Sequence, residues 1–412
     1  MLNKKISYAK TSLKKVDLLA DENATAVSCY VFNGKLKKGL IARRLTYSGN
    51  VPKNCFAVFP SSNGKLFVCN GTVYVCDLSG AGEFVEVGLS GVSKCYFTEY
   101  FKNGTVCVGI GYNRTFYEYL SGTLTKYTLP YSAQCAVYHC GRLFFIDGKS
   151  QRVFWTGIGG VSNVELSLYN SGSLDLSDGK LGEILRIIPM DGKLILAREN
   201  GFSVMRAYGD PENFKVDSLF FYTGKVNPSS LALCGEKLCF LTDSGLYSFN
   251  GSTVEKHELF PDGIVKNVRF SCGVNDKYFL SCYCEKLQKE GVICFNLALK
   301  THYYIDVFAQ TLHGADSAYL INGDGAFRLE EPEEFCGEYT TSKIDFSTRK
   351  NKALRFICIE GANRGIITVQ SDISQRVFAA DRNVKANVSG TWFTVKLSGD
   401  CSANKAIAVA EA

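Results

Sequence analysis

Short apolar runs, each broken by glycine or a polar turn, follow one another along most of the chain. Residues 235–251, GEKLCFLTDSGLYSFNG, show the pattern: an apolar run, a polar turn that ends at Gly245, and a second run rich in aromatic residues. Glycine suits a turn position that needs a positive φ, and aromatic residues favour a pleated strand. The stretch therefore predicts a β-hairpin.

Similar hairpins recur along the sequence, each followed and preceded by a further apolar or mixed strand. Their turn positions lie roughly 40 residues apart, close to the period of a four-stranded propeller blade. These positions are Gly64, Gly104, Gly141, Gly192, Gly235, Asn275 and Gly314. We predict an all-β fold, with a β-propeller of about seven four-stranded blades. Six to eight blades stay open, and a large irregular β-sandwich is the alternative, although its hairpins would have no reason to recur at a near-constant spacing.

The repeat ends near residue 338, and strict alternation of apolar and polar residues follows. Five or six compact strands in this part predict a small C-terminal β-sandwich. We therefore predict three parts: an N-terminal basic segment with strands that could close the ring (residues 1–50), the propeller (51–338) and the sandwich (339–412). Before the last boundary, a solvated acidic loop is expected at Glu330, Glu331, Glu333 and Glu334.

Charge changes this picture at the N-terminus only. The net charge of +6 is small for 412 residues, so nucleic acid is not expected as the main ligand. Basic residues gather in the first 45 residues, at Lys4, Lys5, Lys10, Lys14 and Lys15, and then at Lys35, Lys37, Lys38, Arg43 and Arg44. The second group is a candidate partner-facing basic patch. A solvated, unstructured leader is the favoured interpretation of the whole segment, and an arm for an acidic partner is the alternative.

Membrane association and secretion are not expected from the sequence. No apolar run approaches the roughly 18 residues of a membrane helix, and no apolar segment follows the N-terminal lysines as in a signal peptide. The 17 cysteines lie mostly inside apolar runs, where cysteine behaves as a small hydrophobic residue. They predict buried thiols in a reducing compartment.

Residues for catalysis or metal binding do not form a recognisable pattern. The four histidines, His139, His257, His302 and His313, fall in different repeats and are expected at surface or edge positions. Cys272, Cys282, Cys284 and Cys294 lack the paired knuckles of a zinc site. Phosphate-loop and nucleophile-elbow motifs are missing. We predict no catalytic residues, no bound metal, no cofactor and no enzymatic activity.

Residues 185–251 carry a more specific signal, in GKLILARENGFSVMRAYGDPENF, a PSSLA segment and LCFLTDSGLYSFNG. With YTTSKIDFSTRKNKALRFICIEG near residue 339 and the segments 369–378 and 392–395, the chain resembles bacteriophage and prophage β-propeller structural proteins of the tail or nozzle type. The resemblance covers roughly residues 185–400. It implies a virion component made in the host cytoplasm, whose partners are other phage structural proteins and which can form a homo-oligomeric ring. The high cysteine content departs from many virion proteins.

Three functions therefore remain as hypotheses. The first is a non-enzymatic structural or assembly component of a phage particle, acting through protein–protein contacts. The second is a glycan-binding propeller, in which Trp155 and Trp392, the two tryptophans, would stack on sugars. The third is a general protein-interaction scaffold, although the kelch and WD signature residues are missing.

Overall fold

The computed structural model describes residues 13–21, 23–147, 149–159, 170–177, 180–220, 224–258 and 265–411. Apart from three short 3-10 segments, η1 (Leu18–Ala20), η3 (Pro211–Asn213) and η4 (Pro228–Ser230), the regular elements of these residues are β-strands. The predicted all-β fold is confirmed. Within the described ranges, no helix has the length and apolar character needed to cross a membrane.

The chain divides into two compact units, which we describe separately. The ring unit comprises residues 42–298 and 307–329, and the terminal unit comprises residues 1–41, 299–306 and 330–412. This division differs from the predicted boundaries at residues 50 and 338, because strands of the N-terminal segment pair with strands near the C-terminus.

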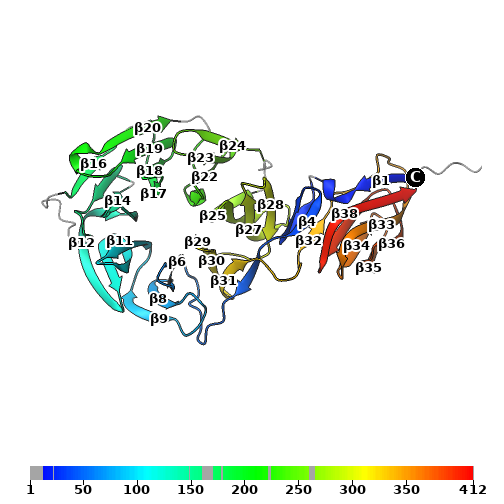
Figure 1. The fold of residues 1–412 in the computed structure, drawn as a ribbon, viewed down its shortest axis with the longest axis horizontal. Helices are drawn as coiled ribbons and strands as arrows, with labels where there is room; N and C mark the ends of the chain where they lie inside the picture. Colours follow the sequence, from blue (N-terminus) through cyan, green and yellow to red (C-terminus); the bar gives the residue numbers. More distant parts are fainter. Residues whose placement is uncertain are drawn as a thin grey trace, which may run out of the picture. The chain divides into compact units, whose positions relative to one another are not determined.

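The ring unit is a β-propeller, in which separate sheets follow one another around a ring (Figure 1). The first sheets in chain order are β6 (Ala57–Pro60), β7 (Lys65–Cys69), β8 (Thr72–Asp77) and β9 (Val85–Ser90); then β10 (Tyr96–Lys102), β11 (Thr105–Leu120) and β12 (Thr123–Ala133); then β13 (Cys135–His139), β14 (Arg142–Asp147), β15 (Arg152–Trp155) and β16 (Gly172–Asp175). The next two are β17 (Ile184–Met190), β18 (Lys193–Arg198), β19 (Gly201–Arg206) and β20 (Lys215–Phe220), and then β21 (Ala232–Cys234), β22 (Lys237–Thr242), β23 (Gly245–Phe249) and β24 (Val254–His257). The last two are β25 (Val265–Val274), β26 (Lys277–Cys284) and β27 (Lys289–Asn296), and then β29 (Thr311–Gly314), β30 (Ala318–Asn322), β31 (Gly325–Glu330) and β5 (Ile41–Arg44).

Most of these sheets have the predicted four strands, but β10–β12 and β25–β27 contribute three strands each to the ring unit. The blade count of about seven therefore stays a prediction. The last sheet takes its outermost strand, β5, from the N-terminal part of the chain. The backbone N–H of Leu45, just after β5, also donates to the carbonyl of Ala326 at 2.9 Å.

The hairpin expected at residues 235–251 is confirmed. Strands β22 and β23 pair with Thr242 opposite Gly245, and Gly245 has a φ of +128°. Neighbouring sheets then share buried side chains. One apolar cluster, for example, includes Ile188 and Phe202 from the β17–β20 sheet and Phe240 and Phe249 from the β21–β24 sheet. Such face-to-face burial is what stabilises each blade, since a four-stranded sheet alone leaves its apolar faces in water.

Close approach of the first strands depends on glycine. A Cβ at Gly273 of β25 would lie 1.9 Å from the Leu233 carbonyl oxygen of β21, and one at Gly314 of β29 would lie 2.4 Å from the Gly273 carbonyl oxygen. No other residue type fits these spaces without moving the backbone. The three strands therefore pack together as closely as they do only because both positions are glycine.

The terminal unit contains two larger sheets and a hairpin. One sheet has the order β1 (Leu13–Asp17), β38 (Cys401–Glu411), β33 (Lys352–Asn363) and β36 (Asn383–Gly390). In the other, β28 (Thr301–Ile305), β2 (Thr25–Val27), β32 (Glu338–Thr340), β37 (Phe393–Ser398), β34 (Ile366–Ser371) and β35 (Gln375–Ala379) are neighbours. Strands β3 (Cys29–Phe32) and β4 (Lys35–Lys38) form the hairpin. Side chains of both sheets, among them Leu354, Ile357, Val369 and Val395, share one buried cluster.

The favoured interpretation of the N-terminal segment as an unstructured leader is wrong for residues 13–44. Strand β1 pairs with β38 along its whole length, from Leu13 opposite Glu411 to Asp17 opposite Ile407. Composition could not reveal this pairing, because the partner strand lies at the other end of the sequence. Lys4, Lys5 and Lys10 lie outside the described residues.

Candidate functional site

The first strands of several sheets, including β6, β17, β25 and β29, lie toward the middle of the ring (Figure 1). Arg186 of β17 is exposed, and its Nη1 donates to the carbonyl of Leu231 at 2.7 Å. The same guanidinium acts electrostatically on Cys135 of β13, Cys272 of β25 and His313 of β29. One cation therefore connects groups from several sheets.

The groups around Arg186 are held in their neutral forms. Burial raises the pKa of the Cys135 thiol to about 11, so the reactive thiolate is scarce at neutral pH. Burial and, second, the Arg186 charge lower the pKa of His313 to about 4. The imidazole packs against Phe59, with ring centroids 5.1 Å apart. This arrangement fits a packed centre better than acid–base chemistry.

We expect His313 to make the ring unit sensitive to acid. The folded protein keeps this imidazole neutral down to about pH 4, whereas the unfolded chain takes up a proton below about pH 6.5. The unfolded state thus binds more protons in this window, and stability falls as the pH falls through it. In thermal unfolding, His313→Gln should lose less of its Tm than the wild type between these two pH values. An unchanged slope in His313→Gln would contradict the prediction.

His139 lies on β13, an edge strand of its sheet, so the expected edge position is confirmed, but it is not at the surface. Its side chain is 9% exposed and packs edge-on against Phe144, with ring centroids 6.2 Å apart. His313 is half-buried against Phe59. Both histidines end or interrupt apolar strands, and the alternating pattern gives no signal that a polar ring there is covered by the next sheet.

A buried carboxylate in the β10–β12 sheet is also fully used. Glu118 is 4% exposed; it accepts a hydrogen bond from the Tyr100 hydroxyl and lies 2.8 Å from Lys102 Nζ. Hydrogen bonds and an opposite charge are what a buried carboxylate needs. The three residues link β10 to β11 across the sheet.

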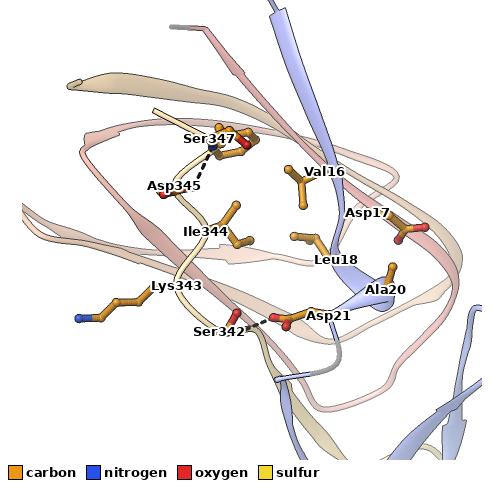
Figure 2. Close-up of a pocket in the computed structure, with 11 residues that line it drawn as sticks. Val16, Asp17, Leu18, Ala20, Asp21, Ser342, Lys343, Ile344, Asp345 and Ser347 are labelled. Atoms are coloured by element: carbon orange, nitrogen blue, oxygen red, sulfur yellow. Dashed lines mark hydrogen bonds between the residues drawn. The ribbon is translucent and has the colours of Figure 1, made fainter. Parts of the chain in front are cut away.

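The terminal unit has a hollow of about 420 Å³ between the segments 16–21 and 342–347 (Figure 2). Its carboxylates serve the backbone. Asp21 Oδ2 accepts from the Ser342 N–H at 2.6 Å, and Asp345 Oδ1 accepts from the Ser347 N–H at 2.8 Å. In Figure 2, Lys343 points away from the hollow; its Nζ lies 4.4 Å from the Trp392 ring centroid. The hydrogen bond between Asp21 and Ser342 therefore connects the N-terminal segment to the C-terminal part of the chain.

A second hollow, of about 520 Å³, lies on the ring unit beside β19, β20 and the end of β23. Its charges are paired: Arg206 Nη2 lies 2.6 Å from Asp217 Oδ2, and Lys193 Nζ lies 3.7 Å from Asp191 Oδ2. Each charged group among the described residues that line these two hollows has a partner.

The candidate basic patch belongs to two units. Lys35, Lys37 and Lys38 lie on β4 of the terminal unit, and Arg43 and Arg44 lie on β5 in the ring unit. Lys38 is already in use, because its Nζ donates to the carbonyls of Pro332 and Glu333. The sequence brought the five residues together only by their proximity along the chain, and their joint role stays a prediction.

The structure shows a second basic surface, which the sequence analysis missed. We call it the basic edge: Arg376, Arg382 and Lys385, all exposed, on or beside the neighbouring strands β35 and β36. None of the three has an ion pair with a described residue. Ile373 and Val377, next to them, are 64% and 60% exposed. β35 is the last strand of its sheet, so one side of its backbone is open for pairing.

An acidic segment of the same unit lies at some distance along that sheet. Glu331, Glu333 and Glu334 are exposed and lead into β32, which is separated from β35 by β37 and β34. We call these three residues the acidic loop. The prediction of a solvated loop agrees with the exposure of these three residues, but it is wrong for Glu330, which ends β31 and is half-buried. The alternation in SQRVFA predicts that Arg376 and Val377 point to opposite faces of a strand, but it does not predict that both are exposed.

The two tryptophans of the glycan hypothesis differ in exposure. Trp155 is 6% exposed and packs against Phe144 and Phe214, so it is not available to stack on a sugar. Trp392 is half-buried under the Lys343 ammonium. Of the two tryptophans, only Trp392 therefore keeps appreciable exposed surface for a sugar.

No family model matches the chain, and no curated protein matches its sequence. Solved structures are similar in fold. The extracellular domain of the putative one component system BT4673 from B. thetaiotaomicron has 12% identity and a TM-score of 0.50, over 86% of this chain and 56% of that one. The extracellular domain of the putative hybrid two component system BT4673 has 13% identity and a TM-score of 0.50, over 90% of this chain and 58% of that one.

The chain thus spans a little over half the length of these two domains. The β-propeller domain of Cps50 (Swd1) from Myceliophteria thermophila has 8% identity and a TM-score of 0.49, over 73% of this chain and 98% of that domain. At 12% and 13% identity, the likeness to the two BT4673 domains concerns the fold alone.

Proposed function

We propose that the chain is a non-enzymatic structural component of a phage or prophage particle, associated with the tail, that assembles through protein–protein contacts. The resemblance in residues 185–400 supports the phage assignment, and the propeller supports a scaffold whose sheet edges are short and protected. In this proposal the terminal unit is the β-sandwich that follows such propellers. The protein is made in the host cytoplasm and ends in the virion.

The observation that carries the assembly proposal is that the terminal unit has two separate surfaces of opposite charge, the basic edge and the acidic loop. The basic edge has three exposed cations beside two exposed apolar side chains, and the acidic loop has three exposed carboxylates. Complementary charge steers and orients association, and the apolar residues supply buried area. A surface that matches a different surface of the same chain makes head-to-tail contacts, which close into a ring when the rotation permits. The occupant of the basic edge is thus the acidic loop of a second copy.

Sedimentation velocity of the full-length chain tests this assembly. The wild type should form oligomers at low salt and dissociate at about 1 M salt, where the Debye length is about 3 Å. Arg376→Glu with Lys385→Glu should give monomers at low salt. Lys53→Glu with Lys126→Glu, the same charge change at exposed ring-unit positions, should still form oligomers. A wild type that stays monomeric at every concentration would count against the proposal.

The phage assignment has a separate test in the genome. Portal, terminase or capsid genes beside the gene for this chain would support it. A neighbourhood of unrelated genes would overturn that assignment, and it would leave the assembly test unaffected.

A further inference from the structure

A third hollow, of about 370 Å³, lies on the ring unit between the β10–β12 and β13–β16 sheets. It is built where four segments end or turn: the start of β10, the middle of β11, the end of β12 and the turn after β14. The register of β11 and β12 shifts between Asn113 and Thr115. Such bulges redirect side chains and are frequent beside binding sites. The volume lies within the range of small-molecule pockets.

Two uncommitted cations distinguish this hollow from the other two. Lys94 and Lys149 line it, both are exposed, and neither has an ion pair with a described residue. Asp147, which also lines it, is engaged with Ser150, whose N–H lies 3.5 Å from Asp147 Oδ1 and whose hydroxyl donates to Oδ2. The hollow therefore has a positive balance and offers two free ammonium groups.

A buried hydroxyl beside the hollow also lacks a partner. Tyr96 lines the hollow, and its Oη is buried with no hydrogen-bond partner among the described residues. An unsatisfied buried hydroxyl is costly. The Tyr96 ring packs directly on Gly111, where a Cβ would lie 1.9 Å from Tyr96 Cζ. It therefore cannot turn toward the sheet to bring its hydroxyl to a hydrogen-bond partner. This Oη is closed to solvent, so a ligand in the hollow does not reach it.

We propose that this hollow binds a carboxylated monosaccharide unit, such as a uronic or sialic acid. Lys94 and Lys149 would pair with the carboxylate, and the Gln134 amide and the Ser132 hydroxyl, both exposed in the lining, would meet the sugar hydroxyls. The Asp147 carboxylate accepts hydrogen bonds from hydroxyl groups and repels a second negative charge. This set favours a singly charged polyol over phosphate. The site is distinct from the assembly surfaces on the terminal unit.

Isothermal titration calorimetry of the full-length chain tests the proposal, with glucuronic acid, N-acetylneuraminic acid, glucose and inorganic phosphate as probes. At least one acidic sugar should bind saturably, and glucose should bind at least about tenfold more weakly, the equivalent of about 1.4 kcal/mol. Lys94→Met with Lys149→Met should weaken the acidic sugar by at least about tenfold. Lys53→Met with Lys126→Met, at exposed positions outside the hollow, should bind like the wild type.

Three results would overturn the proposal. One is the lack of saturable binding of both acidic sugars to the wild type. Another is unchanged binding in the Lys94→Met, Lys149→Met variant while its thermal unfolding matches the wild type. The third is competition by phosphate at equal affinity, which would mean a site for anions in general. If the double variant unfolds at a lower temperature, Gln134→Leu provides the second test, and it too should weaken binding.

Discussion

Replacing Phe202 by alanine is expected to lower the free energy of unfolding of the ring unit by about 3–5 kcal/mol. The ring is fully buried and lies between two aromatic rings of the next sheet. Its centroid is 4.6 Å from that of Phe249, in a stacked arrangement, and 5.2 Å from that of Phe240, edge-on. Alanine would leave a cavity where the β17–β20 and β21–β24 sheets meet, and both sheets would lose contacts.

Urea unfolding followed by circular dichroism measures this change. Phe101→Ala is the matched control, because Phe101 is 56% exposed at the end of β10 and its truncation should cost less than about 1 kcal/mol. Equal losses in the two variants would mean that Phe202 is not part of the core between these sheets.

Replacing Arg198 by methionine should cost about 2–4 kcal/mol. Three acceptors lose their donor, and each should cost less than the roughly 1–3 kcal/mol of a fully buried acceptor, because all three are only partly buried. Arg198 is 1% exposed. Its Nε donates to the Gly182 carbonyl at 3.0 Å, its Nη1 donates to the Leu176 carbonyl at 3.0 Å, and its Nη2 donates to the Gln151 side-chain oxygen. Gln151 and Leu176 flank strands of the β13–β16 sheet, so this one guanidinium joins two sheets.

The control for this variant is Arg206→Met, at the other end of the adjacent strand. Arg206 is exposed and pairs with Asp217, and exposed ion pairs contribute about 0–1 kcal/mol. Urea unfolding should therefore separate the two variants clearly. If Arg206→Met is as destabilising as Arg198→Met, the guanidinium of Arg198 does not fasten the sheets.

The sequence predicts the parts of this fold that depend on neighbours along the chain. Alternation of period two, glycine at the turns and a regular spacing identify the hairpins, including the one that ends in Gly245. These features follow from local backbone geometry, which a few residues determine. The propeller follows because several such hairpins cannot bury their apolar faces separately.

The rest depends on contacts between distant residues, for which a single sequence carries little signal. Nothing in LKKVD indicates that β1 pairs with β38. The sequence predicts a ring-closing strand within residues 1–50, and β5 is such a strand, but the sequence gives no signal that β31 is its partner. The candidate site shows the same limit. A cluster of basic residues along the chain is divided between two units, whereas Arg376 and Lys385 lie on two strands that contact each other only in the folded chain. Lys94 and Lys149 share a hollow only because two sheets pack together.

The central claim is that the basic edge of one copy binds the acidic loop of the next. Its most direct test mixes two charge-reversed chains in sedimentation velocity. One carries Arg376→Glu, Arg382→Glu and Lys385→Glu, and the other carries Glu331→Lys, Glu333→Lys and Glu334→Lys. Each should sediment as a monomer alone, because like charges then face each other at every contact, and an equal mixture should form oligomers because each altered surface finds its complement. A mixture that remains monomeric while the wild type assembles would contradict the claim.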